Sequence, residues 1–312
     1  MNIPETELEV IAESEWLELC AAQLEAARVF TTGPRKRRDC GERHPVEDFL
    51  FEYYPYPFSL LEQWHPKPGT GIRFSDLEAL PARFKGRKYR IDGDVCYLDE
   101  RAITEKERAR LRWILSLLRA TRNHPPNFAC HGLHEWAMVY RAEEIRHSSL
   151  APLRLPQEQI DALIDSRPVV CTHHDAFRFF ARQARPLNRL QPSLDTRHEN
   201  EQPGCVHANM DLYKWAAKSM PWIGPDLLLE IFRLASELRD LDMRASPYDL
   251  SAWNVCPVKI ETSQGRREYE TEQRRLADHA GVLRSKLIDR IGSIVRDSAI
   301  IKSIFELALP QQ

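Results

Sequence analysis

Apolar residues in this chain recur with the period of an α-helix over several long stretches. In residues 224–241 the apolar positions lie three or four residues apart, which places them on one helix face. We also expect helices at residues 5–31, 104–123, 128–146 and 206–219, then a long helix at 264–296 and a short one at 299–308. The pattern predicts a mainly helical, bundle-like domain.

Local signals add helix ends and a small β component. Gly33-Pro34 is expected to end the first helix, which would leave the basic run at 35–38 in a loop. Thr104 and Glu107 have the spacing of a capping box. Asp92-Gly93 between two β-prone runs predicts a hairpin with a type I′ turn. The expected fold class is therefore mainly α, with one β-hairpin and a few short strands.

The chain has 312 residues, of which 43% are hydrophobic, so it can bury a large core. We expect a single mostly helical domain, in which an N-terminal subregion at 1–124 packs on a catalytic core at 125–260 and helices at 261–312 follow. No oligomeric state follows from these features.

Charge and cysteine usage limit the partners of the protein. The formal net charge is -2, so nucleic-acid binding would need a local basic patch. No apolar stretch approaches the roughly 20 residues that span a bilayer, and we expect no membrane association. The seven cysteines form no CxxC pair, which argues against a zinc ribbon or a disulfide scaffold and favours a reducing, cytoplasmic setting.

Histidines are concentrated in one part of the chain. Seven of the eleven lie between positions 131 and 207, and three apolar segments in this range pair histidines with carboxylates. Because helices that face each other can aim imidazoles and carboxylates at one point, the pattern predicts a metal centre. Mixed nitrogen and oxygen ligands suit Fe, Mn or Zn. The predicted ligands are His131, His134, Glu135, His173, His174, Asp175, His207 and Asp211.

Their spacing supports a shared site. His131, His134 and Glu135 are spaced i, i+3 and i+4, so in a helix they would project from one face. His207 and Asp211 are spaced i and i+4. Each histidine alone is also compatible with a hydrogen-bonded core or surface role. Cys130, Cys171 and Cys205 stand at the entrances of the three segments, where we expect them to be small buried side chains.

A second group of carboxylates surrounds the end of the helix predicted at 224–241. Asp240, Asp242 and Asp249 lie near Arg244 and Tyr248 in the sequence. They are consistent with ion pairs at a helix end. They are equally consistent with a carboxylate that stabilises positive charge on a sugar or activates water.

Five strings of the chain resemble a bacterial family commonly labelled 3-methyladenine DNA glycosylase. The strings run from His44 to Phe51, Gly132 to Tyr140, Asp175 to Phe180, Gln202 to Trp215 and Asp242 to Leu250. The resemblance covers about residues 14–290. It implies an enzyme that binds DNA or another nucleobase-containing substrate and removes an alkylated purine.

The resemblance also implies roles for individual residues. A damaged purine would be extruded into an aromatic pocket and its N-glycosidic bond cleaved with the help of a carboxylate. The implied catalytic residues are Asp242, Asp249, Glu135 and Lys214. The implied substrate-binding residues are Trp136, Tyr140, Tyr213, Trp215, Tyr248, Arg178 and Arg244.

Two further function classes remain open. The residue chemistry favours a metal-dependent oxygenase or hydrolase that uses the histidines and carboxylates. A helical module that binds DNA or a protein partner without catalysis is the third hypothesis. Convergence of the predicted ligands in space would favour the metal-dependent enzyme.

Overall fold

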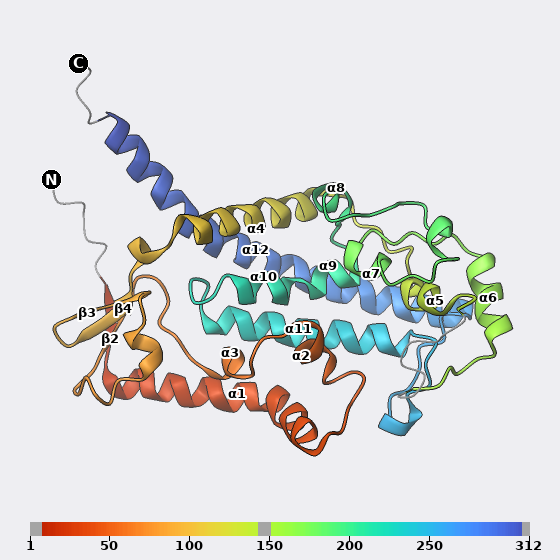
Figure 1. Ribbon diagram of the computed structural model, residues 1–312, viewed down its shortest axis with the longest axis horizontal. Helices are drawn as coiled ribbons and strands as arrows, with labels where there is room; N and C mark the ends of the chain where they lie inside the picture. The colour runs from red at the N-terminus through yellow and green to blue at the C-terminus, as the bar shows by residue number, and fades with distance from the viewer. Residues whose placement is uncertain (1–7, 143–150, 308–312) are drawn as a thin grey trace.

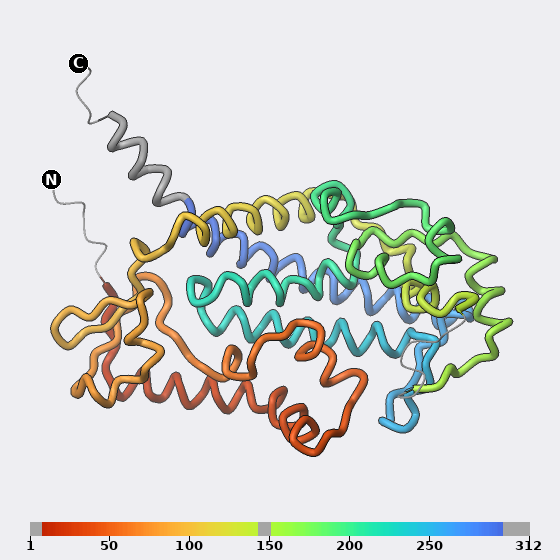
Figure 2. The backbone as a smooth tube through the Cα atoms, in the orientation of Figure 1, coloured from red at the N-terminus to blue at the C-terminus, as the bar shows by residue number. Residues whose placement is uncertain are grey.

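A computed structural model gives the structure of residues 8–142 and 151–307, with side chains described as far as residue 295. The chain is mainly helical, as predicted, with a small mixed sheet at one end of the molecule (Figure 1). The longest helices run roughly along the long axis of the molecule (Figure 2). Among the described residues, no helix is long and apolar enough to cross a membrane.

The centre of the fold is helix α11, Pro225–Arg244, which begins with a proline at its first position after Gly224. Its predicted apolar face is buried. Around it lie α12 (Ser263–Leu307), α10 (Leu212–Lys218) and α9 (Val206–Met210), and α4 (Glu105–Asn123) packs on α12 (Figure 1). The core helices therefore bring the middle and the C-terminal part of the chain together.

The sheet has the order β1-β2-β4-β3, with β1 and β2 parallel and the other pairs antiparallel. Its strands are β1 (Glu9–Ile11), β2 (Thr70–Arg73), β3 (Tyr89–Asp92) and β4 (Val95–Leu98). The predicted hairpin is present, but its turn differs. Gly93 has φ 59° while Asp94 has no positive φ, which is the pattern of a type II′ turn.

Helix α1, Glu13–Cys40, does not end at Gly33-Pro34 as predicted. It continues to Gly41, which adopts the left-handed conformation that closes a helix, and the basic run belongs to its last turns. Arg35 bonds Glu62, and Arg37 bonds Asp48. These ion pairs fix the turns beyond the proline to neighbouring segments, a stabilisation that local sequence does not reveal.

Three other predicted helices have different limits. The helix expected at 128–146 is only α5, Leu133–Val139, because His131 and Gly132 both have positive φ and cannot extend it backwards; residues 143–146 lie outside the described part. The helix expected at 206–219 is divided at Asp211 into α9 and α10. The two helices expected near the C-terminal end are one, α12.

Short elements complete the chain: α2 (Phe49–Tyr53), α3 (Ser59–Glu62), α6 (Gln157–Asp165), α7 (His174–Phe177) and α8 (Arg197–Asn200). The capping box of Thr104 and Glu107 at the start of α4 is confirmed. The strand-like run at 168–172 forms one isolated bridge, between Val169 and Asn188. A continuous cluster of buried apolar side chains includes residues from 1–124, 125–260 and 261–312 alike.

Candidate metal centre

Two groups of side chains, all buried except the half-buried His207, each bring three possible metal ligands together, with one donor atom per residue and all three atoms within 4.8 Å of one another. The first cluster consists of His134 from α5, His207 from α9 and Asp242 from α11. The second cluster consists of His173, Glu201 and Asp211, which lie at the ends of short helices. Segments distant in sequence thus converge, but on two points rather than on the single centre that the sequence predicted.

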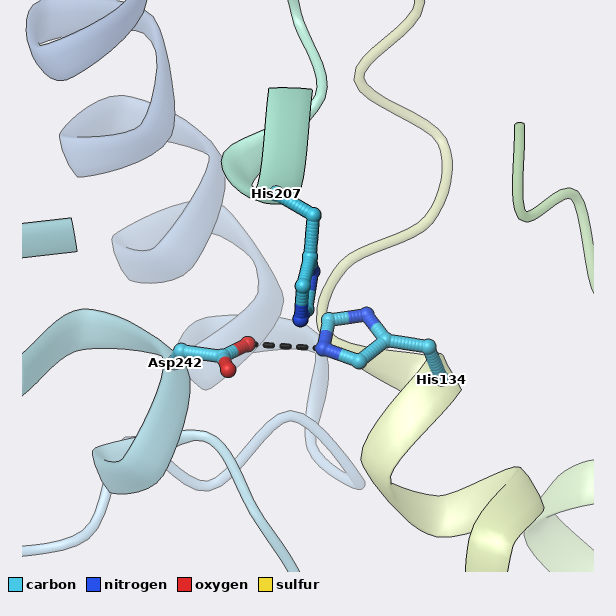
Figure 3. Close-up of side chains that lie close together, drawn as sticks. All are labelled: His134, His207 and Asp242. Atoms are coloured by element: carbon cyan, nitrogen blue, oxygen red, sulfur yellow. Dashed lines mark ion pairs between the residues drawn. The ribbon is translucent and has the colours of Figure 1, made fainter. Parts of the chain in front are cut away.

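In the first cluster, the Asp242 Oδ1 atom lies 2.7 Å from His134 Nε2 (Figure 3). His207 approaches from a third element and points its ring at the gap between them (Figure 3). The rings of His134 and His207 are perpendicular, with centroids 4.5 Å apart. Asp242 is fully buried and His134 is 3% exposed, so both polar groups depend on partners inside the protein.

Asp242 is held in place by Arg239 of the same helix. The Arg239 Nη1 atom lies 3.2 Å from Asp242 Oδ2 and 3.4 Å from Glu135 Oε1. The guanidinium also lies over the Phe49 ring, 3.6 Å from its centroid. Glu135 therefore contacts the cluster through Arg239 and is not one of its three donors.

The protonation states in the first cluster follow from burial and charge. Burial and, after it, the charge of the neighbouring His134 lower the pKa of His207 to about 3, so His207 is a neutral imidazole at pH 7. Burial opposes charge on Asp242, but His134 holds the pKa of this carboxyl below its ordinary value. Burial would also lower the pKa of His134, yet the Asp242 charge raises it well above the usual value. His134 therefore carries a proton at pH 7 when no metal is bound.

In the second cluster, His173 Nε2 lies 3.3 Å from Asp211 Oδ2 and 3.6 Å from Glu201 Oε1. All three residues are at most 2% exposed. The Tyr54 hydroxyl donates a hydrogen bond of 2.6 Å to the other Asp211 oxygen. The rings of His173 and His207 lie 5.6 Å apart between centroids, so the two clusters are neighbours.

Two fixed cations already neutralise the second cluster. The Lys214 ammonium bonds Asp211 Oδ2 and lies 3.2 Å from Asp175 Oδ2. Arg197 bonds Asp175 and places its Nε atom 3.6 Å from Glu201 Oε1. Burial raises the pKa of Asp211, but the Lys214 charge and the His173 contact outweigh it, and the pKa is well below the usual range.

A small cavity adjoins the first cluster. It has a volume of about 20 Å³, enough for roughly one water molecule. Its lining comes from four parts of the chain and includes His134, His207, Tyr269, Gln273, Cys130, Cys171 and Cys205. Burial raises the pKa of the Cys205 thiol to about 12 and that of Cys171 well above its usual value.

Only four of the eight predicted metal ligands belong to the two clusters. His134 and His207 belong to the first cluster, and His173 and Asp211 to the second. The other four belong to neither cluster. His131 Nε2 lies 3.5 Å from Glu270, and His174 Nδ1 lies 3.1 Å from the Pro192 carbonyl oxygen. Glu135 pairs with Arg239, and Asp175 pairs with Lys214, Arg197 and Arg178. His131 misses the shared face because it precedes the helix.

The sequence did not identify Glu201 as a possible ligand and assigned Asp242 only a catalytic role. Glu201 follows directly after α8, in a connection that looked merely polar. The cavity residues Tyr269 and Gln273 were missed as well, since a helix of mixed polarity gives no sign of which face it buries. Only the short distance from Glu201 to His207 along the chain, six residues, could have drawn attention to it.

The aromatic residues that the family resemblance implies for substrate binding lie in the core. Exposed fractions are 0% for Trp136 and Tyr213, 3% for Tyr140, 4% for Trp215 and 6% for Tyr248. Of the implied polar residues, Arg178 and Arg244 are partly exposed and form ion pairs, Lys214 belongs to the surroundings of the second cluster, and Asp249 accepts a hydrogen bond from the Ser251 backbone.

Comparison with known proteins adds no relative: no protein-family model, curated protein or solved structure matches the chain.

Proposed function

We propose that the protein is a metal-dependent enzyme whose metal ion is bound by His134, His207 and Asp242. One observation carries the proposal: two imidazoles and one carboxylate, from three different helices, converge in the protein interior within 4.8 Å. Two histidines and one carboxylate are the ligand set of many iron(II) oxygenases and of some zinc hydrolases.

The state of the three side chains supports metal binding. His207 is neutral and its ring points at the gap between His134 and Asp242, so a ring nitrogen is available as a ligand (Figure 3). Asp242 is ionised. His134 Nε2 and Asp242 Oδ1 lie 2.7 Å apart but have no hydrogen-bond partner among the described residues, and a metal ion bound between them would displace the proton from His134.

The adjoining cavity supports a catalytic site rather than a purely structural one. Catalytic metal sites use three protein ligands and leave a position for water or substrate. The cavity, lined by His134 and His207, has room for such a small molecule. A metal ion bound here would activate a water molecule or dioxygen, which corresponds to a hydrolase or an oxygenase.

An iron–nitrosyl experiment tests both the ligands and the open position. We expect protein loaded with Fe²⁺ without oxygen to give the EPR signal of a high-spin iron–nitrosyl complex when nitric oxide is added. His207→Ala should abolish the signal, whereas His174→Asn, a histidine change outside both clusters, should preserve it. If the wild-type protein binds Fe²⁺ but forms no nitrosyl complex, the metal has no open coordination position. If it binds no Fe²⁺ at all, the proposed metal site is refuted.

Base excision from alkylated DNA is the second candidate function, because Asp242 is held ionised next to the cavity, as stabilisation of a positively charged sugar requires. The implied stacking residues are at most 6% exposed, so a purine could reach them only if the core opened. Release of 3-methyladenine from alkylated DNA in the presence of EDTA, lost in Asp242→Asn, would favour this function over the first.

A further inference from the structure

The connection between α7 and α8 carries a concentration of positive charge. Between Asp175 and Asp195 the chain contains no acidic residue. It contains four arginines there, and all of them are exposed: Arg178, Arg182, Arg185 and Arg189. Arg182 and Arg189 form no ion pair with any residue that the structure describes. Because the formal net charge of the whole chain is -2, this connection is a local exception.

Three leucines of the same connection are also exposed. The exposed fractions of Leu187, Leu190 and Leu194 are 40%, 41% and 62%. Exposed apolar side chains are ordinary where they are scattered singly, but several of them in one patch mark a binding surface. These three lie within one stretch of the chain, residues 187–194, and alternate with the arginines.

Hydrogen bonds hold this connection in place, although most of it is irregular. The Asn188 side chain is buried; it accepts a hydrogen bond of 2.7 Å from the Cys171 amide and donates one of 2.9 Å to the Cys171 carbonyl. The Pro192 carbonyl oxygen lies 3.1 Å from His174 Nδ1. The segment runs along the outer edge of the molecule (Figure 2). A fixed backbone thus presents the leucines to solvent, and little order has to be gained when a partner binds.

We propose that residues 178–194 form a surface that docks on an anionic lipid bilayer. The arginines pair with lipid phosphates, and the three leucines enter the boundary between the head groups and the acyl chains. Arginine suits this position because its aliphatic stem can lie along apolar surface while the guanidinium stays in the polar layer. The sequence predicted no membrane association because no stretch is long enough to span a bilayer, but docking on the surface needs no such stretch.

The residue types favour a bilayer over a protein or a nucleic acid as the partner. The residues that dominate protein interfaces are rich in Trp and Tyr and poor in Leu, whereas this segment contains leucines and neither Trp nor Tyr. Nucleic acids would engage the arginines through phosphates, but single strands also stack bases on aromatic rings, and Phe179 and Phe180 are half-buried and buried. The surface contains none of the proposed metal ligands and so goes beyond the proposed enzyme function.

Co-sedimentation of the full-length protein with vesicles, in the presence of EDTA, tests the surface. We expect the protein to sediment with phosphatidylcholine vesicles that contain about 30% phosphatidylglycerol, and to stay in solution with phosphatidylcholine alone. Serine at positions 187, 190 and 194 together should weaken binding at least about tenfold, the effect of burying one leucine side chain. Arg182→Gln and Arg189→Gln should each weaken it about fivefold, the effect of one cation near an anionic membrane.

The matched control combines Leu17→Ser with Leu19→Ser. These leucines of α1 are 50% and 40% exposed, but they lie beside the exposed acidic residues Glu15 and Glu18, so this variant should bind anionic vesicles like the wild type. Hydrogen exchange of the wild-type protein should slow in residues 182–194 when anionic vesicles are added. This second measurement needs no variant and therefore does not depend on the folding of one.

Three results would overturn the proposal: no sedimentation with anionic vesicles, wild-type binding by the triple leucine variant, or an equal loss in the α1 control. Equally tight binding of DNA or polyglutamate that does not depend on the leucines would also overturn it, because the surface would then recognise polyanions in general. EDTA keeps metal out of every arm, so these results are independent of the proposed metal centre.

Discussion

The two clusters contain the same kinds of donor but differ in what compensates their charge. Both bring imidazole and carboxylate atoms within 4.8 Å, and all of their residues are buried except the half-buried His207. In the second cluster, the Lys214 ammonium and the Arg197 guanidinium bond the carboxylates or lie close to them. In the first, Asp242 faces a single fixed cation, Arg239, and its only other charge partner is the His134 imidazole, which can give up its proton. A ligand-like geometry therefore indicates a metal site only where no side-chain cation already occupies it.

The largest effect should come from the second cluster. Asp211→Asn removes the fully buried carboxylate that pairs with Lys214 and accepts a hydrogen bond from Tyr54, and we expect the free energy of unfolding to fall by about 3–5 kcal/mol. Urea unfolding in EDTA measures it. The control Asp240→Asn removes a half-exposed partner of Arg244 and should cost at most about 1 kcal/mol. A similarly small effect for Asp211→Asn would contradict a structural ion-pair network.

The first cluster should respond to metal instead. Mn²⁺ binds poorly to thiols, so it reports on the histidine–carboxylate centre alone. At about one hundred times its dissociation constant, it should raise the free energy of unfolding by about 2.7 kcal/mol. The gain should vanish in His207→Ala and persist in His174→Asn. Equal gains in these two variants would place Mn²⁺ elsewhere.

Acidity should weaken metal binding at the first cluster. The Asp242 charge raises the pKa of His134, and the ion must displace that proton. At pH values below the raised pKa of His134, the affinity for Mn²⁺ should therefore increase by up to about tenfold for each unit that the pH rises. Titration calorimetry in buffers of different ionisation enthalpy would detect the released proton. An affinity independent of pH between 6 and 8 (about the range where His134 competes) would contradict the account.

Without metal, the two histidines of the first cluster affect stability in opposite directions. The pKa of His134 is raised above 6.5, so its contribution is complete below that pH and is lost as pH rises through the folded pKa. The pKa of His207 is lowered to about 3, so the folded state loses stability as pH falls from 6.5 towards 3. In urea unfolding with EDTA, the free energy of unfolding of His207→Ala should fall less with acidification than that of the wild type. An unchanged fall would refute a neutral His207 in the folded protein.

The smallest effect should come from Glu135, which the sequence placed among the ligands. Its carboxylate contacts only the edge of the cluster, through Arg239, and burial raises its pKa. Glu135→Gln should therefore lower the free energy of unfolding by about 1 kcal/mol, the typical worth of one hydrogen bond, and retain Mn²⁺ binding. Complete loss of Mn²⁺ binding would show that Glu135 is a ligand.

Periodicity predicted the helices well where apolar spacing is regular, as in α11, and where a cap is local, as at Thr104. It failed where tertiary contacts decide, as in the turns of α1 beyond Pro34, which Arg37 ties to Asp48. It failed again at His131, whose positive φ was not visible in the residue type.

For the candidate site, the sequence identified the segments but not the pairing of their donors. His134 and His207 were predicted to meet, and they do. Their third partner, Asp242, lies 35 residues beyond His207, and only the packing of α11 on α9 brings it there. Lys214, which fills the second cluster, was visible one turn after Asp211, but its effect on metal binding depends on a distance that the sequence does not contain.

Anomalous diffraction from crystals soaked in Mn²⁺ tests the central claim most directly. The account predicts an anomalous peak enclosed by His134 Nε2, a His207 ring nitrogen and an Asp242 oxygen, with the space between His173, Glu201 and Asp211 free of any peak. A peak at the second cluster, or none at the first under saturating Mn²⁺, would contradict it.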